Sequence, residues 1–194
     1  LSGSYNYQEG VIKTNDILKV KLKSNINHEL FKWLKAGANI SCNYLHINLI
    51  PGANLGSTII GRAVQQRPFD RPYKPNGGYY TGGTDELLLH NAVQILSEET
   101  SYTDNYRFIG SFWAEAQIIK GLTVRASYNN DSAYTYDYIY YNQNHPYAAD
   151  KGRILDRNRF VMTNTIDLDA NYNRKIGEGF VVGAMGGHSF LTTR

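Results

Sequence analysis

The sequence predicts an all-β fold built from about seven antiparallel strands in up-and-down order. Three observations lead to this prediction. Apolar and polar residues alternate along seven segments, the connections between these segments differ regularly in length, and most segments are about ten residues or longer. Side chains of a strand point alternately to opposite faces, so a period of two indicates a strand with one apolar face.

The first three predicted strands lie close together at the start of the chain. Leu1–Gln8 alternates apolar residues and glycine with serine, asparagine and glutamine. Ile17–His28 alternates aliphatic side chains with lysines, and Leu34–His46 alternates aliphatic residues with lysine, asparagine and serine. Each segment therefore has one apolar and one polar face.

The pattern breaks over residues 47–100, which contain four of the five prolines, two Gly-Gly pairs and an arginine-rich stretch. A connection this long is uncommon inside a compact domain and is usually functional. We predict a long extracellular loop here. Its part Glu86–Ser97 is expected to form a short helix, because its leucines and valine do not have strand spacing.

Four more strands are predicted in the second half of the chain: Asn105–Ile119, Leu122–Tyr136, Arg159–Tyr172 and Phe180–Ser189. Lys120 and Gly121 form a tight turn between the first two of these strands, and residues 137–158 form a polar loop rich in tyrosine and asparagine. Short and long connections thus alternate along the chain.

This asymmetry is typical of outer-membrane barrels, which have short periplasmic turns and long extracellular loops. No run approaches the roughly 18 apolar residues of a spanning helix, which excludes a helical membrane protein. The mean hydropathy of −0.44 agrees with a barrel, because only every second side chain of a strand faces lipid. We therefore expect a section of a transmembrane β-barrel in a bacterial outer membrane.

Composition and motifs argue against several other functions. The net charge of +3 is too small to indicate a nucleic-acid partner. The single cysteine, Cys42, cannot form an internal disulfide, and the five histidines are scattered without metal-ligand spacing. The sequence has no phosphate-binding loop and no nucleophile motif. We predict neither an enzyme nor a metal or cofactor site.

Four segments in order resemble barrel strands of the SusC/RagA-like TonB-dependent transporters: Tyr5–Lys13, Phe31–Asn39, Ala114–Arg125 and Asn171–Lys175. The resemblance implies a large barrel with an N-terminal plug domain, energised by the TonB complex and covered by a SusD-like surface lipoprotein. It also implies import of oligosaccharides or peptides through the outer membrane of Bacteroidetes. The segment Leu1–Arg194 contains no plug, so we expect it to be one section of the barrel.

Charged side chains on the polar strand faces are candidate lumen residues: Lys19, Lys21, Lys23, Arg125, Asp167 and Asp169. The lysines either attract an anionic substrate or pair with carboxylates of the plug or of neighbouring strands. The two aspartates lie on the strand next to that of Arg125, and a cross-strand ion pair between Arg125 and Asp169 is expected.

Planar donors and aromatic rings in the long loop are candidates for contact with a substrate or with a lid protein: Arg62, Gln65, Gln66, Arg67, Arg71, Tyr73, Asn76, Tyr79 and Tyr80. The tyrosine-rich loop Tyr136–Asp150 is a second candidate. An alternative hypothesis remains, namely a soluble or surface-exposed β-domain that binds glycans without transporting them. Such a domain would bury its apolar faces in a core of its own.

Overall fold

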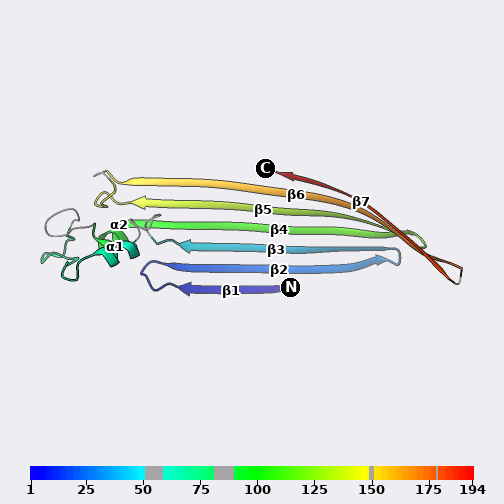
Figure 1. Cartoon of the computed structure of the whole chain (residues 1–194), viewed down its shortest axis with the longest axis horizontal. Coiled ribbons are helices and arrows are strands. Elements are labelled where there is room, and N and C mark those ends of the chain that lie inside the picture. The colour runs from blue at the N-terminus through cyan, green and yellow to red at the C-terminus, as the bar shows by residue number, and fades with distance from the viewer. Residues whose placement is uncertain (51–58, 81–89, 149–150, 178) are drawn as a thin grey trace.

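The computed structural model describes residues 1–50, 59–80, 90–148, 151–177 and 179–194. These residues form seven antiparallel strands in a single sheet, whose spatial order is also the chain order, so the predicted fold class is confirmed (Figure 1). The strands are β1 (Ser2–Glu9), β2 (Asp16–Phe31), β3 (Leu34–Asn48), β4 (Glu99–Ile119), β5 (Leu122–Tyr141), β6 (Arg153–Ile176) and β7 (Phe180–Thr193).

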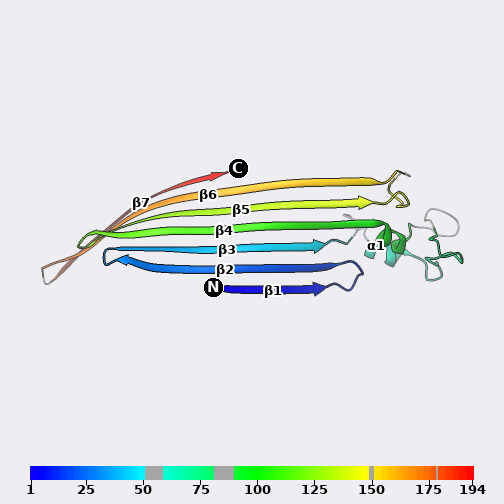
Figure 2. The same ribbon diagram turned by 180° about the vertical axis from the view of Figure 1, so that it is seen from behind.

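The connections gather at the two ends of the sheet according to their length. The short turns after β2, β4 and β6 lie at one end, and the long loops after β3 and β5 lie at the other (Figures 1 and 2). The turn between β4 and β5 depends on Gly121, whose φ is 94° and where an added Cβ would stand 2.7 Å from the carbonyl oxygen of Asn173. Glycine adopts this left-handed conformation without strain.

The strands are longer than the sequence pattern predicts, and they grow mainly toward the long loops. β4 begins at Glu99 rather than at Asn105, and the predicted loop over residues 137–158 is wrong at both ends. Its first residues, up to Tyr141, pair with Arg153–Arg157 as a continuation of β5 and β6. These segments carry tyrosines, aspartates and arginines in place of a clean apolar alternation, and tyrosine has a high strand propensity.

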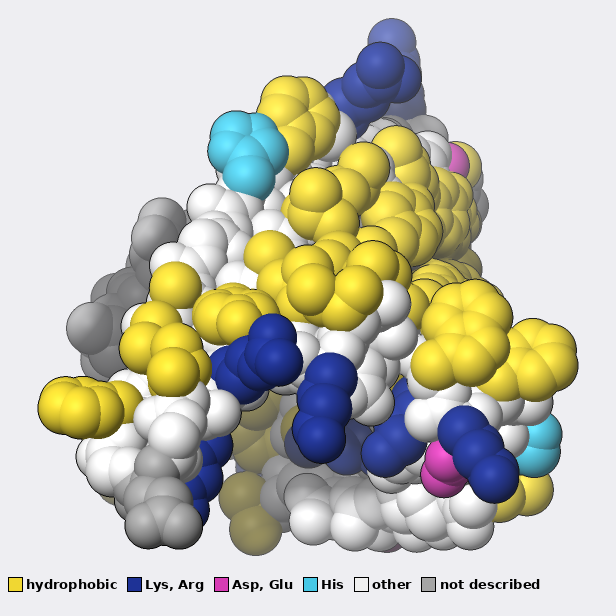
Figure 3. Space-filling view, turned by 90° about the vertical axis from the view of Figure 1, so that its right-hand side faces the viewer, with side chains coloured by type: hydrophobic (Ala, Val, Ile, Leu, Met, Phe, Trp, Pro, Cys, Tyr) yellow, Lys and Arg dark blue, Asp and Glu magenta, His cyan; other side chains and the backbone are white. Residues whose placement is uncertain are grey.

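Strand register gives the sheet one apolar and one polar face. Directly paired residues share a face, and one row across the sheet contains Tyr5, Val20, Tyr44, Tyr106, Tyr134 and Phe160. Rings of this row lie close together: the ring centres of Tyr44 and Tyr106 are 4.9 Å apart. Figure 3, seen from the short-turn end, shows hydrophobic side chains gathered in a broad patch with lysines and arginines grouped below it.

The sheet has no hydrophobic core of its own. Among the described residues, the buried hydrophobic side chains are Ile59, Ile95 and Ala148, and all three lie in the long loops. On the apolar face of the sheet, Phe160 is 58% exposed and Leu168 is 51% exposed. An apolar surface of this extent requires an apolar surrounding or a partner.

The predicted long loop corresponds to the connection between β3 and β4. Its described parts contain α1 (Ile59–Gln65) and α2 (Ala92–Glu98), which contact each other. The expected helix over Glu86–Ser97 is present from Ala92 onward, while residues 81–89 lie outside the described residues. In the part of the chain that the structure describes, no helix is long and apolar enough to cross a bilayer.

Candidate functional site

The three lysines of β2 lie on the polar face and form rows with polar residues of β3 and β4. Lys21 is paired with Asn43, which is paired in turn with Arg107, and Lys23 is paired with Ser41. On the other side of β2, Ser4 and Asn6 of β1 are paired with Lys21 and Lys19. The alternation in β2 therefore places its lysines among amides and hydroxyls that come from distant parts of the sequence.

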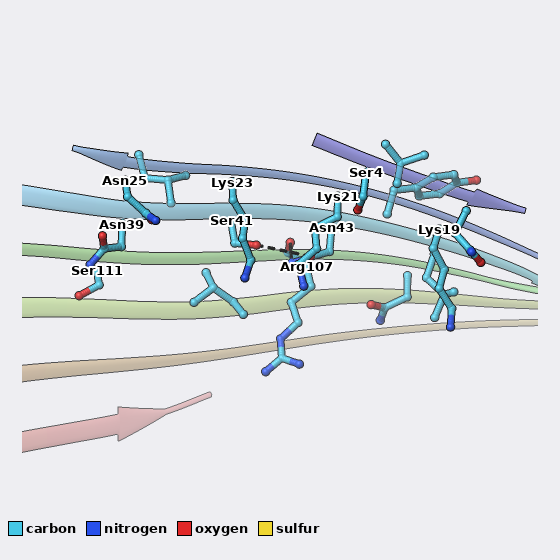
Figure 4. Close-up of a pocket in the computed structure, with 17 residues that line it drawn as sticks. Ser4, Lys19, Lys21, Lys23, Asn25, Asn39, Ser41, Asn43, Arg107 and Ser111 are labelled. Atoms are coloured by element: carbon cyan, nitrogen blue, oxygen red, sulfur yellow. Dashed lines mark hydrogen bonds between the residues drawn. The ribbon is translucent and has the colours of Figure 1, made fainter. Parts of the chain in front are cut away.

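These residues line a groove of about 670 Å³ on the polar face. Its labelled side chains project toward the same side of strands β1–β4 (Figure 4). They are Ser4, Lys19, Lys21, Lys23, Asn25, Asn39, Ser41, Asn43, Arg107 and Ser111. We call this surface the basic groove. Its side chains offer many hydrogen-bond donors, of which four are cationic.

Arg107 is the cation of the basic groove that has an internal carboxylate partner. Its guanidinium makes a bidentate contact with Asp131 of β5, with the Nε atom 2.8 Å from Oδ1. Asn43 donates to the backbone oxygen of Arg107 at 3.4 Å. No ion pair involves Lys19, Lys21 or Lys23 within the described part of the chain.

Charge on the polar face differs between the two ends of the sheet. An uncharged row that includes Asn25, Asn39, Ser111, Asn129 and Thr165 divides the two halves. On the loop side, the strands carry the cations Lys19, Lys21, Lys23, Arg107, Arg153, Arg157 and Arg159 and the anions Glu99, Asp131 and Asp137. On the turn side they carry the cations Lys35, Arg125 and Lys175 and the anions Glu29, Glu115, Asp167 and Asp169.

The predicted ion pair between Arg125 and Asp169 is not formed, although the register does place these residues opposite each other. Arg125 lies 4.0 Å from Glu115 of β4, and its guanidinium lies 4.6 Å from the ring centre of Trp113. The prediction is wrong because a guanidinium stacks favourably on an indole ring, which the neighbouring strand supplies.

Asp167 and Asp169, with Arg125, line a second space on the polar face, of about 460 Å³. Asp167 accepts hydrogen bonds from the hydroxyls of Ser127 at 3.2 Å and Ser189 at 2.6 Å, and from the amide of Asn129 at 3.1 Å. Neighbouring strands thus satisfy this carboxylate, which gives it a structural role in the sheet.

The long loop is held together by Asn91, a residue that the sequence prediction missed. Its Oδ1 atom caps α2 by accepting from the backbone nitrogens of Val93 and Gln94, while its Nδ2 atom donates to the carbonyls of Pro72 and Tyr80 at 2.7 and 3.1 Å. An N-cap contributes about 1 kcal/mol and each further hydrogen bond about 1 kcal/mol. An asparagine directly before a helical segment was the available signal.

The segment Pro72–Tyr80 that Asn91 holds is a tight hairpin containing four of the predicted loop residues, namely Tyr73, Asn76, Tyr79 and Tyr80. Tyr73 and Tyr79 form an isolated antiparallel bridge with ring centres 5.5 Å apart. The ammonium of Lys74 lies 5.8 Å from the ring centre of Tyr80. The hairpin therefore presents a small group of tyrosine rings above the loop end of the sheet.

Arg62 and Tyr147 connect the two long loops. The guanidinium of Arg62 in α1 donates to the hydroxyl of Tyr147 at 3.1 Å, and the Tyr147 ring packs against His90 and His145. Burial, together with the nearby charges of Arg62 and His145, lowers the pKa of His90 below its usual value. His90 is therefore kept neutral inside this loop contact.

The remaining predicted loop residues have different surroundings. Arg67 pairs with Asp70 at 2.8 Å and lies over the ring of Phe69. Gln65 and Arg71 are exposed, while Gln66, the residue directly after α1, is half-buried. The structure thus brings the rings of Tyr73 and Tyr79 together, and it places Arg62 in the contact between the loops.

Comparison with known proteins supports the resemblance stated from the sequence. No model of a protein family matches the chain. The chain is 26% identical over 199 residues to the TonB-dependent receptor P26 of Formosa agariphila. The aligned region covers 96% of this chain and 19% of that receptor. The resemblance to TonB-dependent transporters is confirmed.

Solved structures of RagAB, described as a peptide importer or peptide transporter, have the same fold. The closed-closed state covers 97% of the chain with a TM-score of 0.74 at 22% identity, and a further RagAB structure covers 96% with a TM-score of 0.75 at 22% identity. The chain spans about a fifth of the length of the receptor and of the RagAB chain that it matches. The relatives are receptors or transporters rather than enzymes.

Proposed function

We propose that this chain is a section of the barrel of an outer-membrane TonB-dependent importer for large nutrients. The observation that carries the proposal is the division of one continuous sheet into an apolar face without a core and a polar face with a basic groove. In a transmembrane barrel the apolar face meets lipid and the polar face lines the lumen. Lys19, Lys21, Lys23, Arg125, Asp167 and Asp169 are then lumen residues.

Strand length supports a membrane crossing. A tilted strand needs about 9–11 residues to span a bilayer, and β4, β5 and β6 contain 21, 20 and 24 residues. The excess extends these strands beyond the bilayer at the end where the long loops lie. The long loops would then stand outside the cell, with Arg62, Gln65, Gln66, Arg67, Arg71, Tyr73, Tyr79 and Tyr80 as residues for contact with substrate or a lid.

The partners in this proposal follow from the resemblance. A SusD-like surface lipoprotein would cover the loop end, and the TonB complex would act through a plug domain outside this segment. The imported nutrient would be an oligosaccharide or a peptide. Aromatic rings such as those of the Pro72–Tyr80 hairpin suit both substrate classes, since they pack against sugar rings and against apolar side chains.

A topology experiment tests the proposal in cells that produce the full-length protein. In a Cys42→Ser background, Asn76→Cys in the hairpin and Lys120→Cys in a short turn are each treated with a membrane-impermeant maleimide. We expect labelling of position 76 in intact cells and of position 120 only after the outer membrane is opened. Equal labelling of both positions in intact cells, or recovery of the protein in the soluble fraction, would contradict the proposal.

A further inference from the structure

We propose that the basic groove selects an anionic oligosaccharide, a sugar polymer that bears carboxylate or sulfate groups. This inference rests on the proposed function and narrows its substrate class. The groove lies on the loop-side half of the polar face, where the strands carry seven cationic side chains and three anionic ones. A substrate that enters from the loop end meets this half first.

The cations of this half outnumber its anions, and each anion has a partner other than the three lysines of β2. Asp131 is bound by Arg107, Glu99 lies 3.5 Å from His145, and Asp137 accepts a hydrogen bond from Thr103 at 2.7 Å. Lys19, Lys21 and Lys23 are exposed and form no ion pair among the described residues. A wall with an excess of one sign of charge concentrates counter-charged ligands near it.

The spacing of the lysines suits a polymer with repeated charges. Alternate positions of a strand lie about 7 Å apart, so the three lysines are attached along a line of about 14 Å on one face of β2. Arg107 belongs to the same row as Lys21, but its guanidinium is held by Asp131, so among the described residues the lysines supply the unpaired cations of this line. A single small anion would use one of these groups, whereas an extended polyanion can contact several at once.

The uncharged residues of the groove favour a sugar over an acidic peptide. Asn6, Asn25 and Asn39 each carry a donor and an acceptor, and Ser4 and Ser111 add hydroxyls. Ser41, Asn43 and Asn105 already take part in hydrogen bonds within the sheet. Sugar hydroxyls also donate and accept, so such amides can match them in pairs. A peptide with varied side chains would require apolar subsites, and Leu45 and Ile109 are the aliphatic side chains that the groove offers on the polar face.

The test measures uptake in cells that produce the full-length protein, supplied with fluorescent oligogalacturonate, sulfated dextran, neutral dextran or oligoglutamate of matched length. The variant Lys19→Gln/Lys21→Gln/Lys23→Gln is compared with the wild type and with a control, Lys32→Gln/Lys35→Gln/Lys175→Gln. The control removes the same charge at the short-turn end. Protein in the outer membrane is quantified by antibody, so a loss of folding is seen separately.

We expect uptake of the two anionic sugars to fall about fivefold or more in the β2 variant, the combined effect of three exposed ion pairs. The control and neutral dextran should change little, and added salt should weaken anionic uptake in the wild type. Preference for oligoglutamate over both anionic sugars would overturn the sugar assignment. Unchanged selectivity in the β2 variant would overturn the inference, and it is the result expected if the lysines pair with an acidic segment of the protein itself.

The failure of this inference is distinguishable from failure of the proposed function. If a neutral glycan or a peptide is imported normally while anionic sugars are not, the proposed import function is retained and the anionic substrate class is rejected. If the full-length protein is absent from the outer membrane, or its removal affects the uptake of no nutrient, the proposed function itself fails.

Discussion

At the scale of single residues, Trp113 organises the turn side of the polar face. Its indole lies over Gly37 of β3, where an added Cβ would stand 2.6 Å from the ring atoms Cε2 and Nε1. The guanidinium of Arg125 in β5 lies over the same indole ring. One glycine therefore creates the space that allows an aromatic ring to lie flat and bind an arginine.

The substitution Gly37→Ala should displace the indole and break its contact with Arg125. Overpacking of this kind costs about 1–3 kcal/mol. We expect a lower thermal midpoint of the full-length barrel and a shift in tryptophan emission. The control is Gly183→Ala in β7, where the nearest atom to an added Cβ is 4.0 Å away. Equal effects of the two substitutions would argue against a specific role for the Gly37 space.

At the scale of elements, β2 shows how alternation becomes two environments. Asn25 and Ile26 are neighbours in the sequence but lie on opposite faces of the sheet. Asn25 pairs with Asn39 on the polar face, and Ile26 pairs with Ala38 on the apolar face. Ile26 is 57% exposed, as expected of a side chain whose partner is lipid. The two residues lie at nearly the same height along the strand and differ in the face they occupy. Substitutions at these positions therefore compare the two faces directly.

We predict that Ile26→Lys destabilises the barrel and that Asn25→Lys does not. A lysine on the lipid face near the bilayer centre costs about 2–4 kcal/mol, whereas a lumen position remains wet. The measurement is the fraction of full-length protein that migrates as folded, heat-modifiable barrel in outer-membrane preparations. A similar loss for both variants would show that the apolar face does not meet lipid.

Most element types were predictable from the sequence, but several of their ends were not. The alternation in β2 and β3 was strong because lysines and asparagines oppose aliphatic residues. At the loop ends of β5 and β6, apolar residues occupy both faces, as at Ile139 and Tyr140 and at Ile154 and Leu155, so the period of two is hidden. Only pairing with the neighbouring strand identifies these residues as strand.

At the scale of the whole molecule, the sheet is an open structure whose two faces and two edges all need partners. The edge strands β1 and β7 each pair with one neighbour in this structure. Backbone groups at such an edge cannot be satisfied by lipid, so the sheet fits a larger closed barrel. An open sheet of this kind is expected for a section of the proposed transporter barrel and not for a soluble glycan-binding domain.

We predict that the 194 residues produced alone aggregate in water and require detergent or refolding with lipid. The apolar face contains side chains such as Phe112 and Phe160 that are 40% and 58% exposed, and exposed strand edges promote association. Size-exclusion chromatography without detergent checks this expectation. A stable, monomeric and folded protein in water would instead support the soluble β-domain.

The sequence by itself determined the strand order, the two faces and the asymmetry of the connections. These features are local, because a period of two and the positions of proline and glycine can be read within short segments. Only the tertiary structure decided that Lys21, Asn43 and Arg107 form one row, that Arg125 stacks on Trp113, and that Asn91 holds a distant hairpin. These contacts join residues far apart in the chain, and register, which sets them, depends on pairing along the whole of each strand.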